Sequence, residues 1–168
     1  MGLPGSGKTT IGRHLAKRLK LPFRDSDHVL EERIGCSIRT YFEQFGEPQF
    51  RDVESSVIDD LTQEQCVLST GGGAVLRPVN RSRMRERCHV VYLKATPESL
   101  FRRLRHDTQR PLLQVSDPMQ RLNDLFAARD PLYQEVAHYV VDTGRPSIQA
   151  VVSMIVSQLE QAGVLPGG

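Results

Sequence analysis

Apolar residues recur along the chain in short runs that alternate with stretches of helical periodicity. The short runs, rich in β-branched residues, predict strands over residues 21–25, 66–70, 89–93 and 138–142. Between them, apolar positions three or four residues apart predict helices over about 8–20, 27–35, 47–62, 78–87, 97–105, 117–129 and 147–162. Strands that alternate with helices in this way are typical of parallel βαβ units, so the pattern predicts an α/β fold.

The first helix follows a glycine-rich loop. Residues 2–9 read GLPGSGKT, which fits the pattern G-x-x-x-x-G-K-T of a phosphate-binding loop. Its glycines let backbone N–H groups turn toward a phosphate, Lys8 can reach the β- and γ-phosphates, and the hydroxyl of Thr9 can hold Mg²⁺. The loop also opens onto the positive end of a helix. The alternative is a glycine-rich surface turn before an ordinary helix, which would not require the lysine and threonine at these positions. The full pattern therefore favours a nucleoside triphosphate site.

The position of this loop in the chain is unusual for the architecture. A buried parallel strand is expected before such a loop, but only Met1 stands before Gly2. Four or five buried apolar side chains at roughly 1.5–3 kcal/mol each would contribute about 6–15 kcal/mol, comparable to the stability of a domain. We therefore expect that the sequence lacks an N-terminal segment of about eight to twelve residues, including the first strand.

Two aspartates follow the first predicted strand. Asp25 and Asp27 stand two positions apart, so in an extended segment their side chains point the same way. They lie at the carboxyl end of a strand, where open α/β sheets bind ligands. One carboxylate can hold a metal ion or its water, while the other accepts the proton of an attacking hydroxyl. The alternative is that Asp27 only caps a helix beginning at His28 and that Asp25 is exposed.

Three further groups are ambiguous when each is considered alone. Arg51 lies in the first turns of the helix over 47–62, where a solvated charge is the plainer interpretation. Gly71, Gly72 and Gly73 follow a buried strand; they suit a substrate that lies against the backbone, although a tight strand-to-helix turn also uses glycines. Arg129 stands in the segment RDPLY, which we expect to end a helix, so it is either a ligand for an anion or a charge that compensates the helix dipole.

Composition narrows the class of protein. The chain has 168 residues, the size of one domain, with 22 Lys and Arg against 20 Asp and Glu. The basic residues are scattered, which suits small anionic ligands and argues against nucleic acid. Three widely spaced cysteines match no metal-ligand pattern, and no apolar run reaches the length of a membrane span. We therefore predict a cytoplasmic protein with no nucleic-acid or membrane partner. We also expect it to be a monomer, although composition does not indicate the oligomeric state.

Taken in order, the motifs resemble those of the shikimate kinase family over nearly the whole chain. The stretches that carry the resemblance are GLPGSGKTTIGRHLA, FRDSDHVLEERIGCSI, FGEPQFRDVE, TGGGAV, VVYL, RPLL, ARDPLY and VDTGRP. Phosphate loops occur in many families, but DSD, GE-x-x-FR, GGG and R-x-PLY together are specific. The resemblance implies a three-layer P-loop kinase fold with a parallel sheet of order 2-3-1-4-5, formed by a single domain over residues 1–168.

The resemblance also implies a set of nucleotide and metal ligands. By this resemblance, the phosphates of ATP would be bound by residues 5–10, namely Gly5, Ser6, Gly7, Lys8, Thr9 and Thr10. Mg²⁺ would be held by Thr9 and, through water, by Asp25. Arg110, in a lid over about 105–116, would neutralise charge on the transferring phosphoryl group, and Arg145 falls near the turn that contacts adenine.

For the acceptor, the resemblance implies shikimate, phosphorylated on its ring 3-hydroxyl in aromatic amino-acid biosynthesis. Asp27 would bind that hydroxyl and act as its base or orienter, beside Lys8 and Arg110 as the other catalytic groups. Arg51 and Arg129 would bind the carboxylate, and Gly71 to Gly73 would supply the backbone against which the ring lies. The alternatives are a gluconate-kinase-like enzyme of the same fold and a nucleotide-binding module without catalytic activity.

Overall fold

A computed structural model of the chain describes residues 1–104, 116–144 and 147–165. Its strands are β1 (Phe23–Asp25), β2 (Val67–Ser69), β3 (Val91–Lys94) and β4 (Tyr139–Asp142). Its helices are α1 (Lys8–Leu19), α2 (Ser26–Ile34), α3 (Ile38–Phe45), α4 (Glu47–Leu61), α5 (Pro78–Arg87), α6 (Pro97–Leu104), α7 (Pro118–Val136) and α8 (Ile148–Gln161), with a short 3₁₀ turn, η1 (Ala74–Leu76). The predicted alternation of strands and helices is confirmed.

The strands form two parallel pairs. β1 pairs with β2, with Phe23 opposite Val67, and β3 pairs with β4, with Val91 opposite Tyr139. Met1 lies beside β3: its nitrogen donates to the carbonyl of Val91 at 2.9 Å, and the amide of Leu93 donates to the carbonyl of Met1 at 2.8 Å. These two bonds are the pattern of a parallel ladder, so the first residue continues the β3–β4 sheet on its other side.

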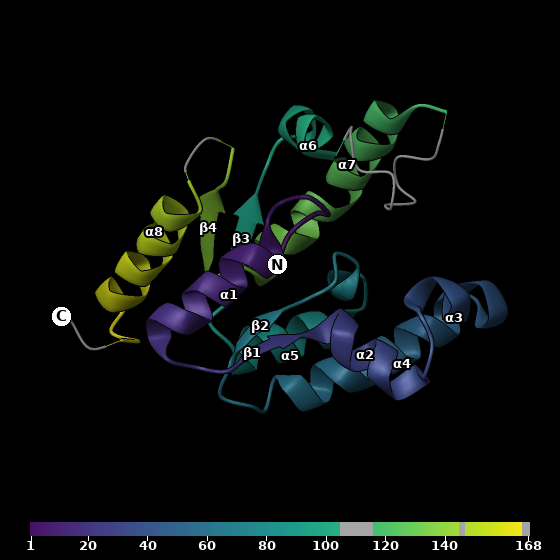
Figure 1. Cartoon of the computed structure of the whole chain (residues 1–168), viewed down its shortest axis with the longest axis horizontal. Coiled ribbons are helices and arrows are strands. Elements are labelled where there is room, and N and C mark those ends of the chain that lie inside the picture. The colour runs from purple at the N-terminus through teal and green to yellow at the C-terminus, as the bar shows by residue number, and fades with distance from the viewer. Residues whose placement is uncertain (105–115, 145–146, 166–168) are drawn as a thin grey trace.

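The position between the two strand pairs holds no strand among the described residues. Figure 1 shows the N-terminus there, between β3 and the pair β1 and β2. Behind Met1 is a cavity of about 450 Å³, lined by residues of β2, β3, α1 and α8. The two pairs fit the outer strands of the predicted order 2-3-1-4-5, with Met1 beside β3 on the side toward the other pair.

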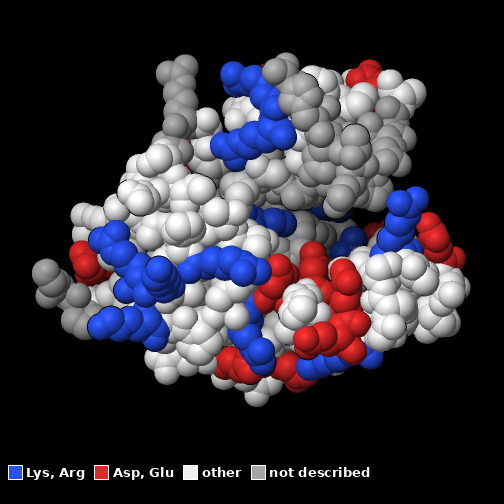
Figure 2. Space-filling model, in the orientation of Figure 1, with Lys and Arg blue, Asp and Glu red and all other residues white. Residues whose placement is uncertain are grey.

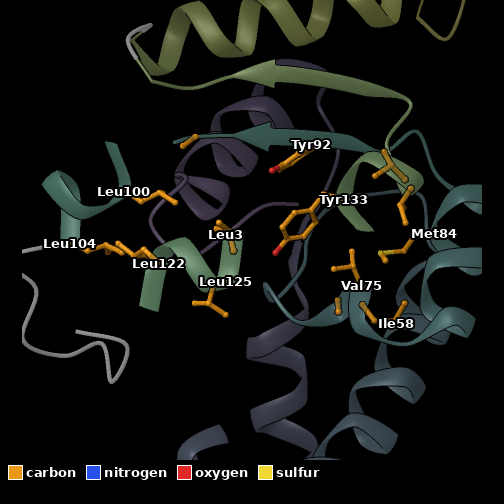
Figure 3. Packing of buried hydrophobic residues seen from close by; sticks show 14 residues of the cluster. Leu3, Ile58, Val75, Met84, Tyr92, Leu100, Leu104, Leu122, Leu125 and Tyr133 are labelled. Carbon is orange, nitrogen blue, oxygen red and sulfur yellow. The ribbon is translucent and has the colours of Figure 1, made fainter. Parts of the chain in front are cut away.

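Helices cover both faces of the strands, which makes the three layers. On one face α1 and α8 pack on the strands through Ile11, Leu15, Val152 and Ile155. On the other face, shown in Figure 3, Tyr92 from β3 and Tyr133 from α7 stack with ring centroids 4.8 Å apart. A smaller cluster joins α2, α3 and α4 beside this core. None of the described helices is both long and apolar enough to cross a bilayer.

Two helical predictions are wrong. The apolar pattern does not predict α3, a short amphipathic helix between two glycines with positive φ, Gly35 and Gly46. It also ends the next-to-last helix at residue 129, whereas α7 continues to Val136 with Pro131 inside it. An interior proline costs about 3 kcal/mol or more in a helix. The buried side chains of Tyr133 and Val136 offset that cost, because they tie the segment after the proline to the core.

Candidate active site

The phosphate-binding loop has the backbone conformation that its glycines allow. Gly5 and Gly7 have φ of +87° and +89°, in the left-handed region that favours glycine, and Gly7 caps α1. No side chain caps this helix, and its first turn contains no acidic residue. The first turn of α1 therefore brings no carboxylate of its own to these amides, and the end of the helix suits an anion.

This loop forms one wall of a cleft with a volume of about 520 Å³. Figure 2 shows the surface hollowed beside the part of the molecule that carries α2 and α3. The cleft lies at the carboxyl ends of β1 and β2, where Asp25 and Ser69 end their strands. Its lining consists of Pro4, Gly5, Gly7, Lys8, Thr9, Thr10, Asp25, Asp27, Ser69, Thr70, Gly72, Arg103 and Leu104. The loop and both aspartates of the DSD motif thus face the same space.

The two aspartates have different positions from those expected in an extended segment. α2 begins at Ser26, so Asp27 lies in its first turn, and the carboxylate of Asp25 caps the helix by accepting from the amide of Asp27 at 3.0 Å. The interpretation that Asp27 is the cap and Asp25 merely exposed is therefore wrong. Burial raises the pKa of Asp27; the nearby ammonium of Lys8 opposes that shift, and the carboxylate of Asp25 reinforces it. Asp27 is thus a half-buried carboxylate close to the charge of Lys8.

The three consecutive glycines leave room for three charged side chains. A Cβ added to Gly71 would lie 2.6 Å from Oδ1 of Asp27, and one added to Gly73 would lie 2.4 Å from Nη1 of Arg51. At Gly72 the same atom would lie 3.2 Å from Nη1 of Arg129. One carboxylate and two guanidiniums therefore converge on one short backbone segment. The segment also turns into η1, as the interpretation of a strand-to-helix turn predicts, and a substrate lying against its backbone stays a prediction.

Arg51 is anchored by a buried carboxylate. Its Nη1 lies 2.8 Å from Oε1 of Glu54, one turn along α4, and the side chains of Arg51 and Glu54 are 12% and 2% exposed. Burial raises the pKa of Glu54, and the adjacent Arg51 guanidinium acts in the opposite direction. The interpretation of Arg51 as a solvated charge is wrong, because the side chain is enclosed by Glu54, the ring of Phe50 and the glycine segment.

Arg129 lies inside α7, about two turns before the helix ends at Val136. The interpretation that it compensates the dipole at a helix C-terminus is therefore wrong. One turn further on, the hydroxyl of Tyr133 donates to the carbonyl of Gly72 at 2.6 Å. Burial raises the pKa of Tyr133 to about 12, although the neighbouring guanidinium of Arg129 opposes the shift. Arg129 and Tyr133 thus approach Gly72 from two successive turns of α7.

Three residues at this site are not predicted from the sequence. They are Glu54, Tyr133 and Arg103, whose Nη1 donates to the carbonyl of Gly5 at 3.0 Å. Glu54 follows Arg51 by three positions and Tyr133 follows Arg129 by four, so the spacing of helical neighbours is a signal that could have found both. No spacing in the sequence indicates Arg103, because its contact with the phosphate-binding loop depends on the tertiary fold.

Several predicted residues lie outside the described part of the chain. These are Arg110 and most of the lid over about 105–116, together with Arg145. The remaining predicted residues gather around one cleft on the same side of the strands as Lys8. Their individual roles stay predictions.

Comparison with known proteins identifies similar chains along the full length. The family model for shikimate kinase matches residues 4–160. The shikimate kinase of Paracidovorax citrulli is 57% identical over 170 residues, which cover 99% of this chain and 93% of that protein. That of Ralstonia nicotianae is 54% identical, covering 98% of this chain and 87% of that one.

Solved structures give the same grouping. Shikimate kinase from Acinetobacter baumannii, in complex with shikimate, has a TM-score of 0.91 and 42% identity, covering 98% of this chain and 92% of that one. A gluconokinase from Sinorhizobium meliloti has a TM-score of 0.65 at 19% identity, covering 96% of this chain and 90% of that one. The second likeness shows a shared fold alone.

Proposed function

The chain belongs to the shikimate kinase family, and from that premise we propose that its cleft transfers the γ-phosphoryl group of ATP to the ring 3-hydroxyl of shikimate. The products are shikimate 3-phosphate and ADP. The observation that carries this assignment at the site is the convergence of Asp27, Arg51 and Arg129 on three consecutive glycines beside the phosphate-binding loop. That arrangement offers one proton acceptor and two carboxylate ligands to a small ring acid.

The nucleotide would enter from the side of α1. Backbone amides of residues 5–10 would bind its phosphates at the uncapped N-terminus of the helix, and Lys8 would place a positive charge on the transferring group. Phosphoryl transfer spreads negative charge over the equatorial oxygens, so positioning and cations supply most of the rate enhancement. Arg103 would hold the loop itself, through the carbonyl of Gly5.

The acceptor would lie against the glycine segment. Arg51 and Arg129 would bind its carboxylate, because a guanidinium presents two parallel N–H groups to a carboxylate. Asp27 would accept a hydrogen bond from the 3-hydroxyl and take its proton as the new P–O bond forms. The raised pKa of Asp27 suits this role, since a more basic carboxylate accepts a proton more readily.

The residues near the phosphates also suit Mg²⁺. Thr9 offers a hydroxyl and Asp25 a carboxylate, one oxygen of which already accepts from the amide of Asp27. Across residues 1–104, 116–144 and 147–165 no group of three or more His, Cys, Asp and Glu side chains could hold a metal ion. A small ligand set fits an ion that keeps waters and binds substrate phosphates. When bound, Mg²⁺ would neutralise charge on the phosphates.

The remaining parts of the assignment rest on the sequence. We propose that Arg110 supplies a further positive charge from the lid over about 105–116, and that Arg145 lies near adenine, within a single domain over residues 1–168. We also propose that the protein acts as a monomer in the cytoplasm; its three cysteines are free, as a reducing compartment favours.

A coupled assay of ADP release tests the function directly. We expect release with shikimate, MgATP and the protein, little release with gluconate in place of shikimate, and a product phosphorylated at the 3-position by NMR. Phosphorylation of gluconate instead would reject the substrate assignment. Binding of ATP without transfer to either acid would identify a nucleotide-binding module without catalytic activity.

A further inference from the structure

We propose that Arg81, on α5, is a positioning residue for the acceptor: it fixes the glycine segment, residues 71–73, relative to α7, and so sets where Arg129 meets the acid. Arg81 is not among the described residues that line the cleft, so it acts through the groups that it holds. The inference rests on the proposed function, because the acid that it concerns is the acceptor named above.

The turn that follows the glycine segment is completed by side chains of α5. The turn η1 has only three residues, too few to supply its last carbonyls with amides of its own. Nδ2 of Asn80 donates to the carbonyl of Ala74 at 3.0 Å. Nη1 of Arg81 donates to the carbonyls of Val75 and Leu76 at 2.8 Å and 3.2 Å. Two consecutive residues in the first turn of α5 thus hold all three carbonyls of η1, where an unpaired buried carbonyl would cost stability.

The turn and the glycine segment form one continuous hydrogen-bonded unit. The amide of Ala74 donates to the carbonyl of Gly71, and the amide of Leu76 donates to the carbonyl of Gly73, each at 3.1 Å. A displacement of η1 therefore moves the glycines with it. Because Arg81 binds the last two residues of η1, it restrains the glycine segment from outside the cleft.

The same guanidinium also holds α7. Nε of Arg81 lies 2.8 Å from Oε2 of Glu135, in the last turn of α7. Two residues earlier, the hydroxyl of Tyr133 donates to the carbonyl of Gly72 at 2.6 Å. α7 is thus joined to the turn and the glycine segment at two points, one through Arg81 and one through Tyr133. A helix held at two points keeps a fixed direction, so Arg129, one turn before Tyr133, keeps its place against Gly72.

These contacts require the shape of an arginine side chain. Arg81 uses Nη1 for two carbonyls and Nε for a carboxylate, whereas a lysine has one nitrogen to offer at one place. The side chain of Arg81 is 19% exposed and that of Glu135 is 60% exposed, so the ion pair by itself adds little stability. The main effect of the Arg81 contacts is therefore on the geometry of the site.

α5 offers a matched control in Arg87. Nη1 of Arg87 also donates to a backbone carbonyl and a carboxylate, both of Asp59, at 3.2 Å and 2.7 Å, and to the hydroxyl of Thr62 at 3.1 Å. These partners lie at the end of α4 and belong to neither the glycine segment nor α7. A lysine at 87 therefore removes the same kind of contact from the same helix, away from the carboxylate-binding groups.

Steady-state kinetics of Arg81→Lys and Arg87→Lys test the proposal. We expect KM for shikimate to rise about three- to tenfold in Arg81→Lys, with KM for ATP and kcat within about twofold of the parent. All three constants should stay within about twofold in Arg87→Lys. Isothermal titration with shikimate should show the same difference in Kd. Added to Arg129→Lys, Arg81→Lys should raise KM little further, because the group that it positions has already been removed.

Three results would overturn the proposal. They are an unchanged KM for shikimate in Arg81→Lys, equal rises in the two lysine variants, and a rise in KM for ATP that parallels the rise for shikimate. In the double variant, effects that multiply would contradict the coupling to Arg129. Should Arg81→Lys unfold below the urea midpoint of the parent by more than Arg87→Lys does, Glu135→Gln carries the test, since it removes only the exposed partner. That variant should raise KM for shikimate about two- to threefold, and an unchanged KM would count against the proposal.

The parent protein separates this inference from the proposed function. Release of ADP with shikimate is measured first, and its absence rejects the proposed function. An active parent together with a normal KM for shikimate in Arg81→Lys rejects only the role of Arg81.

Discussion

The carboxylate of Glu54 lies 2.8 Å from the guanidinium of Arg51 at the floor of the site, and it is the more deeply buried partner. The pair fixes the direction in which Arg51 presents its remaining N–H groups. A second carboxylate, Glu47, contacts Arg51 at 3.4 Å, but its side chain is 54% exposed. Arg51 thus contacts a buried carboxylate, Glu54, on one side and a solvent-exposed carboxylate, Glu47, on the other.

Glu54→Gln should weaken the binding of shikimate because Arg51 loses its buried anchor. A charge-assisted hydrogen bond contributes about 1.5–3 kcal/mol, so we expect KM for shikimate to rise about tenfold or more, with KM for ATP unchanged. Steady-state kinetics with each substrate varied in turn measures this. Glu47→Gln is the matched control and should change neither constant by more than about twofold. Equal effects of the two substitutions would contradict the anchoring role.

Tyr133→Phe removes one hydroxyl that holds the glycine segment. The hydrogen bond to the carbonyl of Gly72 should contribute about 0.5–1.5 kcal/mol, so KM for shikimate should rise about 2- to 10-fold while kcat changes less. Tyr92→Phe is the control: its hydroxyl donates to Asp130 at 2.7 Å and does not touch the glycines. If urea unfolding shows the same loss in the free energy of unfolding for both variants but only Tyr133→Phe changes KM, the Tyr133 hydroxyl positions the glycine segment for the substrate.

Arg129→Lys keeps the positive charge but removes the planar pair of donors. We expect KM for shikimate to rise about 10- to 100-fold, with little change in KM for ATP, because an ammonium cannot replace a bidentate guanidinium. Isothermal titration with shikimate gives an independent value. An unchanged affinity would show that Arg129 supports the glycine segment without binding the acid.

Asp27→Asn should reduce kcat by about 10²- to 10⁴-fold, the range for loss of a general base. Binding of ATP should stay close to that of the parent protein, because asparagine keeps the shape of the side chain and the backbone amides of the phosphate-binding loop are unchanged. Single-turnover measurements with saturating substrates separate the chemical step from binding. Activity within about threefold of the parent would reject Asp27 as the proton acceptor.

The same residue predicts a dependence of stability on pH. Burial raises the pKa of Asp27 in the folded protein, so the folded state binds its proton more tightly than the unfolded chain does. The free energy of unfolding therefore falls as pH rises from the ordinary carboxyl range through the raised pKa. Asp27→Asn has no such proton, so its stability relative to the parent should increase with pH. Urea unfolding between about pH 4 and 7 measures the difference.

The sequence predicts best what depends on local chemistry. The phosphate-binding loop and α1 follow from glycines, a lysine and a regular apolar spacing, and the four strands follow from short apolar runs. α3 is missed because it has only eight residues, lies between two glycines and has no fully buried side chain. The end of α7 is misplaced because Pro131 is a strong local signal that buried side chains further on overcome.

The site follows the same division. Asp27, Arg51 and Arg129 can be named from motifs, since their residue types suit proton transfer and carboxylate binding. That Asp25, not Asp27, caps α2 depends on where the helix begins, which the pattern places one or two residues late. Arg103 meets Gly5 across a separation of 98 positions, and no spacing rule relates the two. Contacts between residues so far apart in sequence can be seen only once the helices and strands are packed together.

Asp27, Arg129 and Arg51 each lie against a different glycine of the segment 71–73. The space beside each glycine therefore determines where one of the three charged groups lies. Alanine at 71 would displace the carboxylate of Asp27 and alanine at 73 the guanidinium of Arg51, each without changing the charged residue itself. Alanine at 72 would only crowd Arg129, at 3.2 Å. A single added methyl group would therefore change how these charges are presented to an acceptor. Sequence surveys that score only charged positions would overlook such changes.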